Sequence, residues 1–344
     1  MASEHRGGGP KVLVTGITGQ DGGYLADQLV ARGAEIHGLV RGDDAATDEL
    51  VRRTPGVRLH LGDLGDPDST AELIRELAPE QIYNLGGLTS VAQSWVDPLL
   101  TARINALTVA AMLHSAWELT AAGHPVRFLQ ASSAEIFGNP TARVQNEDTP
   151  IMPVTPYGAA KAYAHHLTKV YRERGMHAGS VILYNHESPR RPTQFVTRKI
   201  TAAAARIAAG DRTPLLLGNL DARRDWGWAP DYVDAMVRAV QLDTPDDYVI
   251  ATGVSHSVRE FVGAAFTAAG VHGWEQYVQV DPAFFRPVDA VELTGDASRA
   301  RTVLGWEPTV SFDELVSRMV QVDMAPAGTA GPGAVGASDE KELG

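Results

Sequence analysis

Short apolar runs alternate with amphipathic segments through the first half of the chain. The apolar runs have the length of β-strands and are bounded by turn residues, whereas the segments between them repeat with a helical period. This alternation is typical of a parallel sheet wrapped by helices. We predict strands at 11–15, 35–40, 57–61, 81–85, 126–131 and 180–184, and helices at 22–33, 67–77, 99–121 and 156–174.

The pattern changes after residue 184 to loops rich in proline and arginine, interrupted by helices predicted at 195–209 and 231–242. A strand at 247–251 is expected to return to the first sheet, and helices at 257–269, 297–304 and 312–324 to form a smaller lobe. The predicted fold class is therefore α/β, a Rossmann-type doubly wound parallel sheet with a smaller, discontinuous α/β substrate lobe. We expect a flexible tail at 1–10, a dinucleotide-binding domain at 11–185 plus about 231–252, a substrate lobe at 186–230 and 253–324, and a disordered tail at 325–344, which is mostly Ala, Gly, Pro and charge.

Gly16, Gly19 and Gly22 follow the first predicted strand and open a helix. Lacking side chains, they let the backbone approach a pyrophosphate at the positive end of the helix. The second strand ends in Val40 and Arg41, where an acid would select NAD and an arginine accommodates the 2′-phosphate of NADP, so NADP is favoured. A solvated loop cation is the alternative for Arg41, because Asp43 and Asp44 follow it.

Tyr157 and Lys161 are four residues apart and share one face of a predicted helix. An ammonium near a phenol stabilises phenolate, so we expect Lys161 to lower the tyrosine pKa from about 10 and make it a general base. Such a pair also occurs by chance, and it gains weight here from the glycine turn upstream.

Ser133 and Glu135 follow the strand at 126–131, at the edge where open parallel sheets bind their ligands. In extended chain they project to the same side and can face a sugar together. The alternative for Ser133 is a loop hydroxyl bonded to its own backbone, and the alternative for Glu135 is a helix-start or solvated acid. Asp63, after the third strand, is placed to accept from an adenine amine, and a helix-capping or turn role is the alternative.

Charge and composition narrow the ligand. The 344 residues carry 30 Lys and Arg against 42 Asp and Glu, a net charge of −12, which disfavours nucleic acid and anionic membranes. An anionic substrate therefore needs a local basic pocket, and we expect one or two of five basic residues in the second half to touch it. These five are Arg191, Arg198, Lys199, Arg224 and Arg286. The chain has no cysteine, no metal-binding histidine spacing and no transmembrane-length apolar run, so we expect a cytoplasmic protein without a metal.

Several longer segments resemble the GDP-mannose 4,6-dehydratases, which are extended short-chain dehydrogenases/reductases, from about residue 11 to residue 323. They are 16–22 (GITGQDG), 185–191 (NHESPRR), 195–200 (FVTRKI), 218–227 (GNLDARRDWG) and 256–261 (HSVREF). Matches of this length are far more specific than a glycine turn alone.

The resemblance implies a lyase that converts GDP-mannose to GDP-4-keto-6-deoxymannose with NADP, acting as a homodimer or homotetramer. It assigns catalysis to Ser133, Glu135, Tyr157 and Lys161, with Glu135 as the base at carbon 5. The implied cofactor residues are Gly16, Thr18, Gly19, Gln20, Asp21, Gly22, Arg41, Asp63, Leu64, Leu85, Tyr157, Lys161, His186 and Arg191. The implied substrate residues are Ser90, Asn185, Glu187, Lys199, Arg224 and Arg286.

The chain departs from the usual family pattern in four places. Ser133 replaces a threonine, and Gly42, Asp43 and Asp44 replace a second arginine and serines. Trp228 replaces a histidine, and the stretch 288–291 (VDAV) has one acid fewer than the family pattern. The alternatives to this function are another nucleotide-sugar 4,6-dehydratase, an epimerase, a ketoreductase or a non-catalytic dinucleotide-binding module. Glu135 argues against a simple reductase, which needs no base at carbon 5.

Overall fold

A seven-stranded parallel sheet forms the centre of the protein. The computed structural model describes residues 9–285 and 292–325. The strand order is β10-β6-β5-β4-β1-β2-β3. In this doubly wound order, strands are added first on one side of β1 and then, from β4 onward, on its other side. The strands are β1 (Lys11–Thr15), β2 (Glu35–Val40), β3 (Arg58–Leu61), β4 (Gln81–Asn84), β5 (Arg127–Ser133), β6 (His177–Leu183) and β10 (Asp247–Ile250).

Helices cover both faces of this sheet because its strands are apolar on both sides. In β1, Val12 and Val14 join one buried cluster and Leu13 joins another, as expected for side chains that alternate along a strand. The first cluster includes α1 (Gln20–Ala31) and α9 (Ala229–Gln241), and the second includes α3 (Pro67–Leu77), α6 (Thr108–Ala121) and α7 (Pro156–Glu173).

The helix predicted at 99–121 is present but not regular. It consists of α5 (Pro98–Ala102), a π-helical turn at Arg103–Leu107 and α6. A short helix, α4 (Val91–Val96), precedes it. A π-turn re-aims the side chains of one turn, and such turns are frequent at functional sites.

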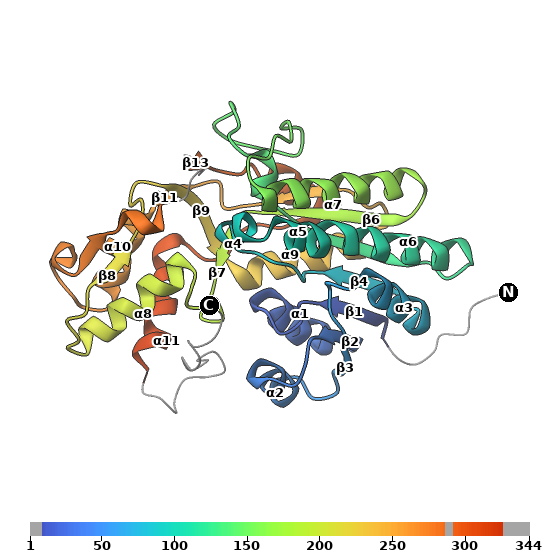
Figure 1. The fold of residues 1–344 in the computed structure, drawn as a ribbon, viewed down its shortest axis with the longest axis horizontal. Helices are drawn as coiled ribbons and strands as arrows, with labels where there is room; N and C mark the ends of the chain where they lie inside the picture. Colours follow the sequence, from blue (N-terminus) through green and yellow to red (C-terminus); the bar gives the residue numbers. More distant parts are fainter. Residues whose placement is uncertain (1–8, 286–291, 326–344) are drawn as a thin grey trace.

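The chain leaves the sheet at the end of β6 and builds a second, smaller lobe. Strand β7 (Asn185–Glu187) begins two residues after β6 ends and pairs with β9 (Arg223–Trp228), which also pairs with β11 (Ser255–Ser257) and β13 (Glu292–Leu293). Strands β8 (Leu215–Leu217) and β12 (Val278–Val280) form a separate pair. The helices α8 (Val196–Ala208), α10 (Val258–Ala268) and α11 (Phe312–Met324) share a second core with β8 and β9, and gather at the left of Figure 1.

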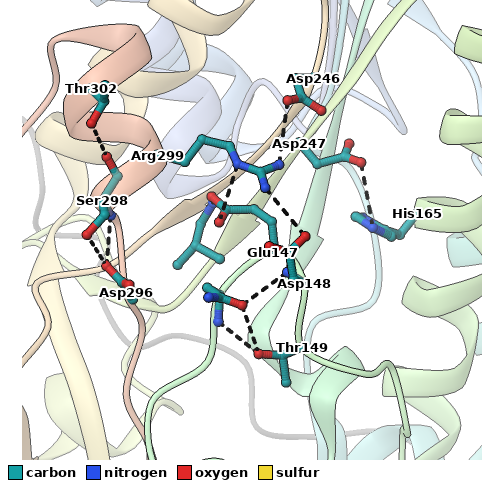
Figure 2. A network of polar contacts seen from close by, with 12 residues as sticks. Glu147, Asp148, Thr149, His165, Asp246, Asp247, Asp296, Ser298, Arg299 and Thr302 are labelled. Atoms are coloured by element: carbon teal, nitrogen blue, oxygen red, sulfur yellow. Dashed lines mark hydrogen bonds and ion pairs between the residues drawn. The ribbon is translucent and has the colours of Figure 1, made fainter.

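A charged cluster holds the free edge of the sheet at β10. Arg299 lies between Glu147, Asp148 and Asp246 at 3.5 to 3.7 Å, as Figure 2 shows. The Glu147 carboxylate also accepts the Val249 N–H at 2.8 Å, so a side chain takes the place of a neighbouring strand.

The structure confirms the predicted fold class and all seven predicted strands, with ends that differ by up to three residues. It adds α2 (Ala45–Arg53), α4 and the short strands of the second lobe, which the sequence analysis did not predict. The helix expected at 297–304 is shorter, a π-helical turn at Ala300–Leu304. Throughout the described ranges, no helix has the length and apolar character required to cross a bilayer.

Candidate active site

The turn after β1 requires glycine. Gly16 has a φ of +67°, and a Cβ there would lie 2.8 Å from the Cα of Gly86. A Cβ on Gly22 would lie 2.2 Å from the Gly16 carbonyl oxygen. The backbone therefore forms a cradle at the start of α1, where the first N–H groups lack helical acceptors, and this cradle fits a phosphate group.

Several residues of the predicted cofactor set lie around this cradle. Thr18 and Gly19 are exposed at the turn. Leu64 and Leu85 border it, since a Cβ on Gly86 would lie 2.5 Å from Leu64 Cδ1 and a Cβ on Gly16 would lie 3.0 Å from the carbonyl carbon of Leu85.

Gln20 and Asp21 point toward the segment after β6. Gln20 Nε2 donates to the His186 carbonyl at 3.0 Å, and the Ser188 hydroxyl donates to Gln20 Oε1 at 2.8 Å. Asp21 Oδ2 lies 2.8 Å from His186 Nε2. These contacts join the first turn of α1 to the 186–191 segment.

Ser133, Glu135 and Tyr157 converge at the carboxyl edge of the sheet. Ser133 ends β5, and Glu135 lies in the 3-10 turn that follows (Ala134–Phe137). The backbone N–H of Glu135 donates to the Ser133 hydroxyl at 3.3 Å. The expected extended geometry is therefore wrong for this pair, and the turn brings them together instead. Ser133 hydrogen-bonds the Tyr157 phenol, and Glu135 is close enough to raise its pKa electrostatically.

The start of α7 lies against the turn that carries Glu135. Thr155 caps the helix by accepting the Gly158 N–H at 2.9 Å. A Cβ on Gly158 would lie 2.5 Å from the Glu135 carbonyl oxygen. The absence of a side chain at 158 therefore sets how closely Tyr157 approaches Ser133 and Glu135.

We expected Lys161 to lower the pKa of Tyr157, and for the protein without a ligand this expectation is wrong. Burial raises the pKa of the Tyr157 phenol to about 12, and the hydrogen bond from Ser133 offsets this only in part. Lys161 Nζ lies 5.9 Å from the centre of the phenol ring and donates to the Ala131 carbonyl at 2.9 Å. Burial also lowers the pKa of Lys161 to about 8, so its ammonium loses its proton more readily than that of an ordinary lysine.

A buried chain of hydrogen bonds connects the glycine turn to Lys161. The Thr15 hydroxyl accepts the Gly86 N–H at 3.0 Å and donates to Asn84 Oδ1 at 2.7 Å. Asn84 Nδ2 donates to Gln130 Oε1 at 2.8 Å, and Gln130 Nε2 donates at 2.8 Å to the same Ala131 carbonyl that Lys161 contacts. Thr15, Asn84 and Gln130 are each at most 2% exposed. The sequence analysis did not identify them, although polar residues within apolar strands were the available signal.

Asn105 was also not predicted and lies in the π-helical turn. Its Oδ1 accepts the Leu88 N–H at 3.0 Å and its Nδ2 donates to the Leu88 carbonyl at 2.8 Å. A Cβ on Gly87 would lie 2.6 Å from Asn105 Oδ1 and 3.9 Å from Lys161 Nζ. Asn105 therefore holds the loop after β4 beside Lys161.

The predicted substrate residues are spread over two regions. Glu187, 1% exposed, accepts from the Thr197 hydroxyl at 2.7 Å and lies 3.4 Å from Arg191 Nε. Arg191 is near enough to Tyr157 to lower its pKa. Asn185 begins β7 beside them.

The remaining basic residues have contacts within the second lobe. Lys199 Nζ lies 4.0 Å from the centre of the Phe284 ring, and burial lowers its pKa. Arg224 is buried and donates to the Arg223 carbonyl at 2.7 Å. Arg198 is ion-paired with Asp323, and Arg286 lies outside the described residues.

Three further predicted positions have local contacts. Asp63 Oδ1 accepts the Gly65 N–H at 2.8 Å, the turn contact that was the alternative for this residue. Ser90 caps α4 by accepting the Gln93 N–H at 3.2 Å. Arg41 is exposed at the end of β2. Within 9–285 and 292–325, no cluster of three or more His, Asp or Glu side chains is arranged to hold a metal ion.

Comparison with known proteins identifies the family. The family model described as GDP-mannose 4,6 dehydratase matches residues 13–319. The chain belongs to the GDP-mannose 4,6-dehydratase family. Its relatives include GDP-mannose 4,6 dehydratase 2 of Arabidopsis thaliana, 43% identical over 91% of this chain and 86% of the relative. The GDP-mannose 4,6 dehydratase of Homo sapiens is 41% identical over 91% of each chain.

Solved structures show the fold of this GDP-mannose 4,6-dehydratase family member in other proteins. The UDP-glucose 4-epimerase of Thermus thermophilus, in complex with NAD, aligns with a TM-score of 0.78 and 27% identity, covering 92% of this chain and 100% of that one. RMD from Pseudomonas aeruginosa complexed with NADPH aligns with a TM-score of 0.73 and 23% identity, covering 92% and 99%. At this identity, the second match shows the fold alone.

Proposed function

We propose that this protein is a GDP-mannose 4,6-dehydratase, which converts GDP-mannose to GDP-4-keto-6-deoxymannose with bound NADP. The observation that carries the proposal is the convergence of Ser133, Glu135 and Tyr157 at the carboxyl edge of the sheet, with Lys161 behind the phenol. The names of the relatives, at 41 to 43% identity over most of the chain, support the substrate.

Each side chain suits one proton step. Tyr157 takes the proton of the sugar 4-hydroxyl while Ser133 holds the oxygen, and the resulting 4-ketone acidifies the hydrogen on carbon 5. Glu135 takes that proton and passes it to the carbon 6 hydroxyl, which leaves as water. The proton that Tyr157 took, which exchanges with solvent, is returned to carbon 5. A nicotinamide dinucleotide held at the glycine cradle would supply the hydride acceptor for carbon 4 and the hydride donor for carbon 6, so the reaction would be redox-neutral.

The residues at the glycine cradle support a dinucleotide, and the end of β2 supports NADP. Val40 is buried where an NAD-selecting acid would stand, and Arg41 is exposed beside it. Asp44, the acid that could oppose a 2′-phosphate, caps α2 by accepting the Thr47 N–H at 2.8 Å. Its charge therefore faces the positive end of that helix.

Self-association as a homodimer or homotetramer is supported by apolar side chains on neighbouring helices. Tyr163 and Val170 on α7 are 45% and 57% exposed, and Leu107 beside α6 is 53% exposed. A second copy that covers these side chains would remove them from water. Sedimentation of the Val170→Asp variant tests this, since an unchanged oligomer would exclude this face.

The test of activity uses purified protein, GDP-mannose and a trace of NADP in heavy water without a reductant. We expect GDP-4-keto-6-deoxymannose with solvent deuterium at carbon 5, and transfer of deuterium to carbon 6 from substrate labelled at carbon 4. An epimerase or a binding module would give neither result. UDP-glucose serves as the control substrate, and turnover of it in place of GDP-mannose would contradict the proposed substrate.

The base is tested with Glu135→Gln. This variant keeps the shape of the side chain but loses the carboxylate, so carbon 4 oxidation should continue while deuterium incorporation at carbon 5 stops. Normal turnover by Glu135→Gln would show that another group is the base.

A further inference from the structure

His186 is a buried histidine whose two ring nitrogens both face acceptors. Nδ1 lies 2.7 Å from the Tyr184 carbonyl oxygen, and Nε2 lies 2.8 Å from Asp21 Oδ2. The residue is 8% exposed, and its ring stacks on Tyr232 of α9 with centroids 4.7 Å apart. These contacts come from α1, the end of β6 and α9, so His186 lies where the cofactor turn meets the start of the second lobe.

A neutral imidazole cannot donate at both positions, because it carries one N–H. The Tyr184 carbonyl only accepts, so Nδ1 carries a proton. The contact with Asp21 therefore needs a second proton, held either by His186 Nε2 or by the carboxyl group.

The surroundings of Asp21 place that proton on the histidine. Asp21 lies in the first turn of α1, where the helix dipole favours a carboxylate. Its other oxygen accepts from Gln20 Nε2 at 3.1 Å, and Arg191 adds positive charge nearby. Burial opposes ionisation of both partners, yet His186, Gln20 and Arg191 keep the pKa of Asp21 below its usual value. Burial and Arg191 lower the pKa of His186, but the charge and hydrogen bond of Asp21, with the Tyr184 carbonyl, raise it above its usual value.

We propose that His186 is a fixed imidazolium at neutral pH, and that Asp21 is the positioning residue that keeps it charged and clamps the 186–191 segment to the first turn of α1. Gln20 reinforces the clamp through the His186 carbonyl and Ser188. Arg191 lies on the clamped segment and contacts Glu187. The charge state of His186 is independent of the proposed function; only the consequence for dinucleotide binding rests on it.

His165 provides an internal control in the same molecule. It is also buried, at 6% exposure, and also has an aspartate neighbour, Asp247, but its Nε2 is 3.9 Å from that carboxylate (Figure 2). Arg172 donates to both oxygens of Asp247, and His165 Nδ1 has no hydrogen-bond partner among the described residues. Burial lowers the pKa of His165, so it should be neutral where His186 is charged.

The first experiment is ¹⁵N NMR of full-length protein with labelled histidine, without cofactor, at pH 7.5. His186→Gln and His165→Gln assign the two rings. We expect both nitrogens of His186 to have imidazolium shifts and those of His165 to have neutral shifts. A neutral His186 in the wild-type protein would overturn the proposal.

The second experiment uses Asp21→Asn, which retains the shape but not the charge. His186 should become neutral at pH 7.5, and NADP binding measured by calorimetry should weaken about 10-fold, as expected for the loss of a charge-assisted hydrogen bond. Asp68→Asn, an acid in the first turn of α3, is the matched control and should change neither. A native His165 signal verifies folding, and an unchanged His186 imidazolium in Asp21→Asn would refute the role of Asp21. Lack of NADP binding by the wild type would contradict the proposed cofactor and leave the NMR result standing.

Discussion

Replacing Gly158 with alanine should separate the phenol of Tyr157 from the turn that carries Glu135. Gly158 lies in the first turn of α7, directly after Tyr157, and its backbone N–H is held by the Thr155 hydroxyl. The new methyl group would point at the Glu135 carbonyl oxygen, so the perturbation acts between two catalytic elements without removing any functional group.

The size of the shift follows from the contact distances. The added Cβ would lie 2.5 Å from the Glu135 carbonyl oxygen, whereas ordinary contact begins near 3.4 Å, so one element must move by about 3.4 − 2.5 = 0.9 Å. A displacement of about 1 Å in a catalytic group can reduce turnover about 100-fold. Overpacking costs about 1–3 kcal/mol of unfolding free energy, and the better helix propensity of alanine returns up to about 1 kcal/mol.

The assay compares kcat and KM for GDP-mannose with the free energy of unfolding in urea. Gly263→Ala is the matched control, because Gly263 is also a helical glycine and its added Cβ would meet Trp274 Nε1 at an ordinary 3.7 Å. We expect Gly158→Ala to lose about 10- to 100-fold in kcat with little change in KM, and Gly263→Ala to keep kcat and gain stability. Full kcat in Gly158→Ala would refute the reasoning that this close approach sets the catalytic geometry.

Three further changes test other parts of the structure. Gln130→Met should lower kcat about 10-fold with little effect on KM, because it breaks the hydrogen-bond chain behind Lys161, whereas Thr168→Val, which removes a buried hydroxyl elsewhere on α7, should not. Arg41→Ala should weaken NADP binding about 10- to 100-fold and leave NAD binding unchanged, as measured by calorimetry. Arg172→Met should lower the free energy of unfolding at pH 7 by about 3–5 kcal/mol, because it leaves a buried carboxylate unpaired. Burial raises the pKa of Asp247, but Arg172 holds it below its usual value, so the stabilisation is present above about pH 4 and is lost as the pH falls through that lowered pKa. Urea unfolding should therefore show the gap between Arg172→Met and wild type narrowing as the pH falls below about 4.

The parts of the fold that local sequence signals determine were predicted well. Strands β1 and β2 have the predicted bounds, because continuous buried runs and the following turns mark their ends. The start of α3 also follows from sequence, since Asp66 accepts the Ser69 N–H at 3.1 Å and Pro67 occupies the first turn. These features depend on neighbours within a few residues.

The missed elements have weak local signals. Helix α2 has a largely polar sequence and two buried residues, Thr47 and Leu50, so its apolar face is too narrow for a clear helical period. Several strands of the second lobe are three residues long, too short for alternation to be detected. Their pairing is decided by the core shared among α8, α10 and α11.

The candidate site depends on contacts between distant positions. Spacing correctly placed Tyr157 and Lys161 on one helix, but it could not reveal that both are buried. It also could not show that Asn84 and Gln130 meet between strands or that Asp21 meets His186, which is 165 residues away. Such partners are fixed by the order of strands in the sheet.

The error over the pKa of Tyr157 has a consequence for the proposed chemistry. With its pKa raised by burial to about 12, the phenol is almost entirely protonated at neutral pH, and Lys161, with a pKa lowered by burial to about 8, contacts a backbone carbonyl. A protonated phenol can act as a base only after its pKa is lowered, which needs more positive charge close to it. Of the groups in the proposed reaction, an oxidised nicotinamide carries such a charge, so the same ligand that accepts the hydride would also activate the base. Burial keeps the Tyr157 phenol protonated in the isolated protein, and it would therefore couple proton removal to the presence of the hydride acceptor. In the low-dielectric site, the charge of the nicotinamide would act on the phenol more strongly than it would in water.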